Sequence, residues 1–234
     1  MKYVMYGVLR EAEDLDQRLP ALAEAESLCL VATGGLVAAV STASAVGPPD
    51  PKRHARIVQM LHEVCTVLPM RCGMGFQTEA EVHALLRDHA EEFRASLAAL
   101  QGYEEMGLRV LCSVTAASTA EAGAGEPPSR TRAYLASRKT YYAGQDAGRR
   151  ELLHVAERMQ RPFDGLFHKC RMTPLSCGDT PILSLQFLVR RSDTERFRDA
   201  FRRLQQQAPE KLLLTGPWPP YNFATLDSAS LLRV

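Results

Sequence analysis

The spacing of apolar residues in the first half of the chain alternates between the period of a strand and the period of a helix. Short β-rich runs predict strands, and apolar residues three or four positions apart predict helices with one buried face. The predicted elements are a strand at 2–9, a helix carrying Leu15, Leu19 and Leu22, strands at 28–33 and 35–43, a helix carrying Ile57, Leu61, Val64 and Leu68, and a strand at 70–76. Their order is β-α-β-β-α-β, which is the ferredoxin-like plan.

Turn and cap residues divide these elements. Gly34-Gly35 suits the positive φ angles of a two-residue hairpin turn, and Asp50-Pro51 predicts the start of a helix. Thr78 and Glu81 have the spacing of a capping box, which opens a helix at 78–101. We expect this long helix to join two domains.

The second half of the chain repeats this order more loosely. Its predicted elements are a strand at 107–115, a loop at 116–129, helical sequence at 130–163, strands at 166–175 and 181–190, a helix at 194–207 and a strand at 212–215. The sequence therefore predicts an α+β fold of two domains, each built on the ferredoxin-like βαββαβ plan. The domains are expected at 1–102, which includes the linking helix, and at 103–234.

Composition excludes two classes of protein. Hydrophobic residues make up 46% of the 234 positions and charged residues 24%, which excludes disorder along the whole chain. Lys and Arg number 28 against 27 Asp and Glu, so the chain lacks the basic excess of a nucleic-acid-binding domain. An arginine cluster at 190–203 is interleaved with acidic residues and predicts a solvated ion-pair face.

A stretch without charged residues runs from Ser27 to Pro49 and is long enough to span a bilayer. Many of its apolar residues are alanine, and a pair of strands around Gly34-Gly35 explains it better, so we expect no membrane partner. The six cysteines form no C-x-x-C pair, and the N-terminus lacks the features of a secretory signal. We therefore expect reduced thiols in a cytoplasmic protein.

No standard catalytic or cofactor-binding motif is present. The chain has no P-loop, no complete dinucleotide-binding glycine pattern, and Thr66 where a zincin helix starting at His62-Glu63 needs its second histidine. His168, Cys170 and Cys177 have the spacing H-x-C-x6-C and are the best candidates for metal ligands. A surface histidine beside packed thiols is the competing interpretation, and we expect no catalytic residue, no cofactor and no metal.

Arg71 is the only charged residue between Val64 and Phe76, on a strand expected to be central in its sheet. An unpaired buried charge is very costly, so this guanidinium must reach the end of the sheet or find a carboxylate. A structural ion pair with Glu79 or Glu63 is one interpretation, and presentation of Arg71 to a partner is the other.

The most distinctive segment is Leu214-Thr215-Gly216-Pro217-Trp218-Pro219-Pro220-Tyr221-Asn222-Phe223. Its three prolines fix φ and remove backbone donors, which imposes extended or polyproline II geometry and prevents ordinary strand pairing. The segment is either a plug, with the only tryptophan, Trp218, buried against the second domain's sheet, or a rigid aromatic array for a partner. We expect the plug, because the segment directly continues a core strand.

The sequence LLLTGPWPPYNF in this segment closely resembles the LTGPWPPYSF-type signature of the gas vesicle protein F/L family. His54, followed by a helix and then VLPMRCG at 67–73, resembles the family's H…VLPLRFGT pattern. The opening YVMYGVL and the L-x-x-L-x-G-Y-E pattern at 97–104 also fit, so the resemblance spans nearly the whole chain. Cys72 and Met74 depart from the usual Phe and Thr.

The resemblance implies a two-domain α+β protein without enzyme activity, located at the gas vesicle or in the cytoplasm. Its implied role is that of an assembly factor or minor shell component that binds the hydrophobic major shell protein, works with other gas vesicle accessory proteins and supports vesicle nucleation. Arg71, Trp218 and Tyr221 then become candidates for a partner-binding or structural motif. Two alternatives stay open: a small-molecule-binding regulatory protein on a ferredoxin-like scaffold, and a metal-dependent enzyme using the His168/Cys170/Cys177 set.

Overall fold

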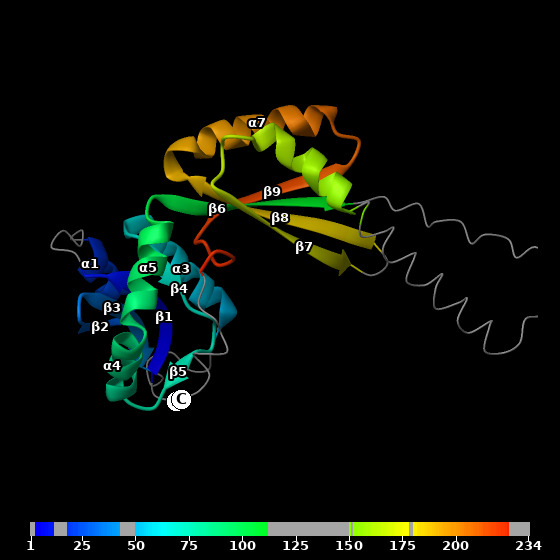
Figure 1. Cartoon of the computed structure of the whole chain (residues 1–234). Helices are drawn as coiled ribbons and strands as arrows, with labels where there is room; N and C mark the ends of the chain where they lie inside the picture. Colours follow the sequence, from blue (N-terminus) through cyan, green and yellow to red (C-terminus); the bar gives the residue numbers. More distant parts are fainter. Residues whose placement is uncertain are drawn as a thin grey trace, which may run out of the picture. The chain divides into compact units, whose positions relative to one another are not determined.

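The computed structural model describes residues 3–11, 18–42, 50–111, 150, 152–177 and 180–224 of the 234-residue chain. Helices and strands are mixed, and the strands form two antiparallel sheets (Figure 1). Within these ranges, no helix combines the length and the apolar character needed to cross a bilayer. The mixed α and β class predicted from the sequence is confirmed.

Five strands from the N-terminal part of the chain form the first sheet. They are β1 (Tyr3–Arg10), β2 (Cys29–Thr33), β3 (Leu36–Thr42), β4 (Val67–Pro69) and β5 (Gly75–Phe76). Their order is β2-β3-β1-β4, and β5 also pairs with β1. All pairings of β1 are antiparallel. Because β1 is central and covered on both faces, its residues from Val4 to Leu9 are buried, which explains its continuous apolar run.

Helices cover both faces of the first sheet. They are α1 (Arg18–Ala25), α3 (Pro51–Val64), α4 (Glu79–Asp88) and α5 (Ala90–Leu100). Leu19 of α1 and Ile57 of α3 share one core cluster with Tyr6 of β1. Phe93 of α5 belongs to a second cluster that contains Met5, the neighbour of Tyr6 on the opposite face of the strand. The alternation of side chains along β1 therefore supplies two cores.

The predicted turn and cap residues have the expected geometry. The Gly34-Gly35 turn has φ angles of 58° and 79°. The Asp50 carboxylate accepts a hydrogen bond of 2.9 Å from the Lys52 amide at the start of α3. The Thr78 hydroxyl accepts a 3.3 Å hydrogen bond from the Glu81 amide at the start of α4.

The predicted long helix at 78–101 is two helices, which corrects the expectation of one joining helix. The helix is interrupted at His89, whose φ and ψ angles are −112° and 20°. Both α4 and α5 pack on the first sheet, so neither is an exposed linker. No glycine or proline marks the interruption, and the apolar period continues through it.

The predicted strand at 70–76 is also corrected. Helix α3 ends at Val64, so Leu68 lies on β4, and the chain then turns before it forms β5. Gly73, with a φ angle of 90°, allows this turn. Arg71 therefore lies on a turn instead of a central strand.

The second sheet contains β6 (Tyr103–Leu111), β7 (Lys169–Cys177), β8 (Thr180–Arg190) and β9 (Lys211–Trp218). The helical segments in this part of the chain are residues 152–160, the 3-10 turns η1 (Arg161–Phe163) and η2 (Arg191–Asp193), and α7 (Thr194–Gln207). The strand order is β7-β8-β6-β9, the same order by position in the sequence as in the first sheet. The stacked rings of Phe163 and Phe197, with centroids 4.2 Å apart, lie in the core under α7. The predicted loop at 116–129 and most of the predicted helical sequence at 130–163 lie outside the described residues.

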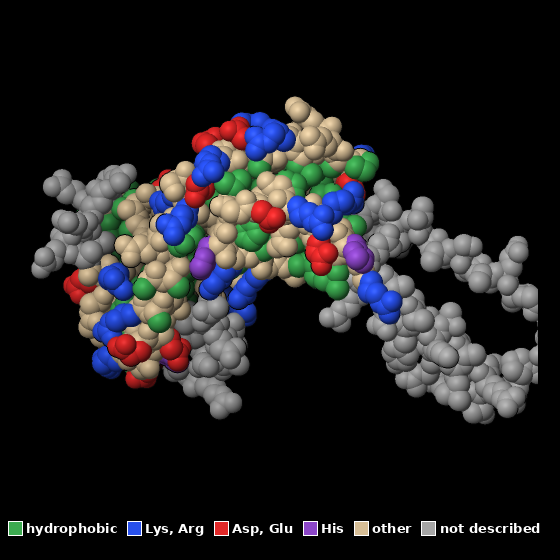
Figure 2. Space-filling model, turned by 45° about the horizontal axis from the view of Figure 1, so that its top comes forward, with side chains coloured by type: hydrophobic (Ala, Val, Ile, Leu, Met, Phe, Trp, Pro, Cys, Tyr) green, Lys and Arg blue, Asp and Glu red, His purple; other side chains and the backbone are tan. Residues whose placement is uncertain are grey.

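The arginines of α7 form the ion-pair face that the sequence predicts. Arg196 pairs with Asp193 at 3.0 Å and Arg198 with Glu195 at 2.5 Å, and Arg202 pairs with Asp199. Basic and acidic side chains are correspondingly interspersed on the face seen in Figure 2. These exposed pairs fit a solvated surface better than a continuous phosphate-binding track.

The described chain divides into two compact units. One contains the residues up to Met106, together with Leu188–Ser192 and the residues from Gly216 onward, and the other contains Gly107–Phe187 and Asp193–Thr215. The sequence-based boundary at Gly102 assigns the C-terminal segment to the second domain, whereas its contacts assign it to the first unit. The reason is Phe223, which is buried in the core cluster of α4 and α5.

Candidate partner-binding site

The turn at 70–74 is anchored by hydrogen bonds at both ends. The Met70 amide donates to the Tyr6 carbonyl oxygen at 2.9 Å, and the Met5 amide donates to the Met74 carbonyl oxygen at 2.9 Å. His54 Nε2 lies 2.8 Å from the Met70 carbonyl oxygen. These contacts to β1 and α3 hold the base of the turn, and Arg71 is exposed at its tip.

His54 connects helix α3 to the turn at 70–74 and to strand β1. It is only 4% exposed, and its ring centroid lies 5.2 Å from that of Tyr6. A carbonyl oxygen can only accept, so Nε2 carries the proton in the bond to Met70. Burial lowers the pKa of His54, and the hydrogen bond to the Met70 backbone opposes this shift. His54 therefore acts as a neutral, buried support for the turn that presents Arg71.

Arg71 does not form the structural ion pair that the sequence suggested. Within the described residues, no ion pair joins it to Glu79 or Glu63. Glu79 lies 3.6 Å from His83, and Glu63 accepts a hydrogen bond of 3.2 Å from Gln59. Arg71 is exposed because β4 ends at Pro69, so the guanidinium reaches the end of the sheet, as one of the two alternatives required.

The C-terminal segment separates into buried and exposed residues. Pro219, Pro220 and Phe223 are buried, whereas Trp218 is 47% exposed and Tyr221 is 40% exposed. The expectation that Trp218 is buried in a plug is therefore wrong. The prolines and Phe223 supply the buried base, and the two amphipathic aromatic side chains project from it.

A buried carboxylate fixes the backbone between these aromatics and the core. Glu105 of β6 is 6% exposed. It accepts hydrogen bonds from the Asn222 amide at 2.9 Å and from the Asn222 side-chain nitrogen at 2.6 Å. Two donors on one ionised group make a strong, directional anchor. This pair fixes the turn that carries Tyr221.

Gly216 allows the segment to approach β6 closely. Its φ angle is 109°, and a Cβ atom at this position would lie 2.7 Å from the Glu105 carbonyl oxygen. The peptide bond between Gly216 and Pro217 is cis. Strand β9 continues through this bond to Trp218, three residues beyond the predicted strand end. The expectation that the prolines prevent strand pairing is therefore wrong at Pro217.

Tyr221 is only partly exposed, and burial of its phenol raises its pKa to about 12, a shift to which Cys72 and Glu105 add when they are ionised. The C-terminal segment and the turn at 70–74 belong to the same compact unit. We define the aromatic surface as Trp218 and Tyr221, and we consider Arg71 on the turn at 70–74 together with it.

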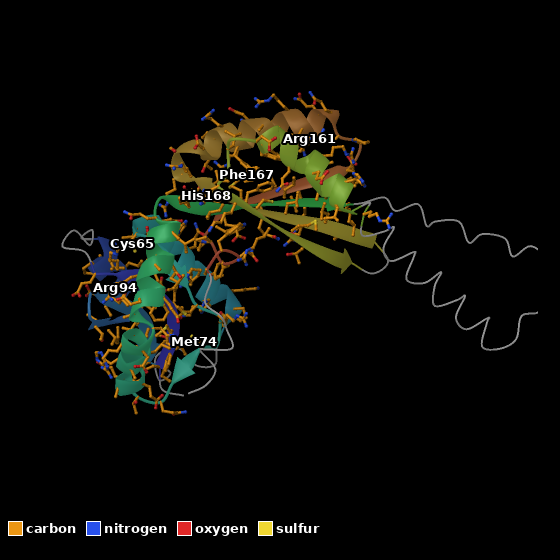
Figure 3. All side chains as sticks on the ribbon, in the orientation of Figure 1. Cys65, Met74, Arg94, Arg161, Phe167 and His168 are labelled. Atoms are coloured by element: carbon orange, nitrogen blue, oxygen red, sulfur yellow. The ribbon has the colours of Figure 1, made fainter. Side chains whose placement is uncertain are left out.

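Of the three candidate metal ligands, the structure describes the side chains of His168 and Cys170. Within the part of the chain that it covers, no group of three His, Cys, Asp or Glu side chains has the arrangement of a metal site. His168 is exposed and lies next to Phe167 in the sequence (Figure 3). Burial raises the pKa of Cys170 to about 11, against an opposing hydrogen bond from Gln160, which disfavours the thiolate that metals bind. The Cys177 side chain lies outside the described residues.

Glu105 and Asn222 are supporting residues that the sequence-based prediction does not include. A signal for Glu105 was available in the strand sequence Glu104-Glu105-Met106. Neighbouring side chains on a strand point to opposite faces, so at least one of two adjacent carboxylates must enter the interior of a covered sheet, and both are buried, at 8% exposure for Glu104 and 6% for Glu105. Its partner could not be identified from the sequence, because Asn222 is 117 positions away.

Comparison with known protein families gives one match over nearly the whole chain. Residues 2–225 match the family described as Gas vesicle synthesis protein GvpL/GvpF. Gas vesicle protein F of Haloferax mediterranei is 25% identical, over 94% of this chain and 92% of that protein. Gas vesicle protein L of a Streptomyces species is 25% identical over 74% of this chain and 68% of that protein.

Solved structures have the same fold. The crystal structure of gas vesicle protein GvpF from Anabaena sp. PCC7120 has a TM-score of 0.69 and 14% sequence identity, and the match covers 96% of each chain. GvpF from Microcystis aeruginosa gives the same TM-score and identity, over 96% of this chain and 99% of that one. At this identity the similarity concerns the fold alone.

Proposed function

Because the chain belongs to the gas vesicle synthesis protein GvpL/GvpF family, we propose that it is an assembly factor or minor component of the gas vesicle shell. In this proposal it binds the hydrophobic major shell protein and supports nucleation of the vesicle. Other gas vesicle accessory proteins are its further partners, and it acts in the cytoplasm and at the gas vesicle. The named relatives are gas vesicle proteins, and we propose that this chain likewise has no enzymatic role.

The observation that carries this proposal is the aromatic surface. Exposed Trp218 and Tyr221 are mounted on a base formed by buried prolines, Phe223 and the Glu105–Asn222 pair. A rigid aromatic pair can bury a large area on a partner while losing little conformational entropy. Such a surface suits an apolar protein partner, and Arg71 on the turn at 70–74 adds a guanidinium able to donate hydrogen bonds to carbonyl or carboxylate oxygens.

We further propose that each half of the chain follows the ferredoxin-like plan. The support is the repeated strand order, β2-β3-β1-β4 in the first sheet and β7-β8-β6-β9 in the second. In both sheets, the first and third strands in sequence are neighbours at the centre. This arrangement is expected if each half is one βαββαβ unit.

The proposal is tested by co-expressing the full chain with the major shell protein from the same gene cluster. The unaltered chain should co-purify with the shell protein and suppress its light scattering at a near-stoichiometric ratio. Trp218→Ala combined with Tyr221→Ala should weaken both effects at least tenfold. Leu213→Ala, which changes another exposed apolar side chain at 51% exposure, is the matched control and should retain them.

Three results would contradict the proposal. Scattering that is unchanged by the unaltered chain would exclude the role in holding the shell protein. Full retention of binding by the double aromatic variant would show that the aromatic surface is not the contact. Equal loss in the Leu213→Ala control would show that the effect is not specific to that surface.

A further inference from the structure

The stretch without charged residues between Ser27 and Pro49 has two structurally different parts. Strand β3 is buried along almost its whole length, and residues Val37–Val40 are at most 3% exposed. Burial explains why β3 carries no charge. Strand β2 has no charged residue either, yet Cys29, Leu30 and Ala32 are exposed, and Leu30 is 36% exposed. The absence of charge in β2 therefore needs another reason.

Strand β2 is the last strand at one edge of the first sheet, within the part of the chain that the structure describes. Its antiparallel register pairs Thr33 with Leu36 across the two-residue turn, and Val31 with Ala38. In a hairpin of this type these are the hydrogen-bonded pairs. Leu30 and Ala32, which alternate with these residues along β2, form the non-hydrogen-bonded pairs. They therefore direct their backbone N–H and C=O groups away from β3.

Among the residues that the structure describes, this edge lacks the protection that natural sheets usually have. Exposed edges are normally blocked by charged side chains, proline or a bulge, because unpaired strand groups recruit other strands. Strand β2 has the sequence CLVAT, and its register with β3 runs without a shift. The two residues with outward backbone groups also carry exposed apolar side chains. The edge is thus suited to pairing with a further strand.

The edge is also held rigidly at its turn end. Arg94 of α5 donates a 2.6 Å hydrogen bond to the Gly34 carbonyl oxygen, and the Glu11 amide donates to the Gly35 carbonyl oxygen at 2.9 Å. The Thr33 hydroxyl lies 2.5 Å from His83 Nδ1 of α4. Figure 3 labels Arg94 on the helix that covers this part of the sheet. A strand that is already ordered loses little entropy when it accepts a partner.

Ionic contacts border the other end of the strand. Arg56 pairs with Glu26 through bonds of 2.8 and 2.7 Å, and Arg53 donates to the Glu26 carbonyl oxygen at 2.8 Å. The uncharged strand is therefore flanked by Glu26 with its arginines at one end and by Arg94 at the other. An apolar centre with a polar border is the usual composition of a protein interface.

We propose that the outer edge of β2 accepts an extended, uncharged segment of the major shell protein as an additional strand. This inference rests on the proposed function and assigns a second contact surface, separate from the aromatic surface. An uncharged apolar strand matches this edge because pairing desolvates no charge. The outward amides and carbonyls provide affinity, and the exposed side chains next to them provide specificity.

A second copy of this chain fits the edge less well. The strand has five residues and is therefore about 17 Å long. Two copies joined only through this strand would bury much less than the roughly 1,200 Å² that a stable protein interface needs. An extended segment can instead be bound through one short edge, as in other cases of strand addition.

The test uses the full chain co-expressed with the major shell protein. Ala32→Pro removes one outward N–H group without removing a hydrogen bond to β3, and proline is tolerated at such edge positions. Leu30→Lys places a charge on the same edge. Each variant should bind the shell protein at least tenfold more weakly, while its thermal unfolding stays close to that of the unaltered chain. Leu213→Lys, at another exposed leucine, is the control and should bind normally.

Hydrogen exchange measures the contact directly. In the free chain the Leu30 and Ala32 amides should exchange rapidly, and addition of the shell protein should slow them at least tenfold. Normal binding by folded Ala32→Pro and Leu30→Lys, or unchanged exchange in the complex, would overturn the inference and leave the proposed function intact. No binding by the unaltered chain would overturn both. Self-association that Leu30→Lys abolishes would identify a second copy as the occupant and refute the proposal.

Discussion

Truncation of Phe223 and truncation of Trp218 should have clearly different effects on stability. Phe223 is 6% exposed and belongs to a core cluster, whereas Trp218 is 47% exposed. Replacement of a buried phenylalanine by alanine removes apolar contacts and leaves a cavity, at a cost of roughly 3–5 kcal/mol. We expect Phe223→Ala to fall in this range.

The cost of Trp218→Ala is smaller because water replaces the lost side chain. A tryptophan buries 150–250 Å² when fully enclosed, so a half-exposed one loses roughly 100 Å² of contact. At about 25 cal/mol per Å², this is at most ~2.5 kcal/mol, and a compact unfolded chain reduces it to about 1–2 kcal/mol. For a chain of this size, each kcal/mol corresponds to roughly 2–4 °C in melting temperature.

The measurement is thermal and urea unfolding of both variants, followed by circular dichroism. Phe223→Ala should melt at least 6 °C below the unaltered chain by this scale, and Trp218→Ala should lie closer to it. Phe223→Leu is the control and should recover most of the loss. Because Trp218 is the only tryptophan, acrylamide quenching of its fluorescence reports its exposure independently. Equal destabilisation by the two alanine variants, together with a poorly quenched tryptophan, would refute this division into base and surface.

Two further predictions concern the same compact unit. Gly216→Ala should destabilise the chain by more than about 3 kcal/mol in urea unfolding, because the added Cβ would lie 2.7 Å from a backbone oxygen at a position with a positive φ angle. Gly102 also has a positive φ angle, of 76°, but open space around it, so Gly102→Ala should cost only about 1 kcal/mol in the same experiment. Burial, assisted by the nearby Arg191 guanidinium, lowers the pKa of His62 to about 4. The unfolded chain therefore takes up the proton first, and stability that is complete above pH 6.5 should fall by up to about 3 kcal/mol as the pH approaches 4. Urea unfolding of His62→Gln should show a weaker pH dependence, and an unchanged dependence would rule out His62 as its source.

The sequence predicts turns, caps and helices well where the signal comes from neighbouring residues alone. The glycine turn at 34–35, the Asp50 cap and the helix at 194–207 each depend on residues that are close in the chain. The break at His89 was missed because neither composition nor periodicity changes there. The turn at 70–74 is not predicted, because apolar residues continue from β4 to β5 on both sides of Arg71 and resemble one continuous strand.

That Arg71, Trp218 and Tyr221 form a site stays a prediction. The motifs around Arg71 and Trp218 indicate the chain segments, but the exposure of each side chain depends on distant partners. Glu105 holds Asn222, and Phe223 enters a core formed by α4 and α5. These long-range contacts decide that the prolines and Phe223 are buried and that Trp218 is exposed. No pattern within the segment itself contains this information.

The aromatic surface and the β2 edge reverse the usual placement of polar and apolar groups. A carboxylate, Glu105, is buried, while Trp218, Tyr221 and Leu30 are exposed. Burial of a charge gives little net stability even when it is well bonded, and exposed apolar groups favour aggregation. Selection for stability alone would remove both features. Their coexistence with well-packed cores on both faces of the first sheet is better explained by a partner that covers the apolar groups. In the proposed function, the major shell protein is this partner.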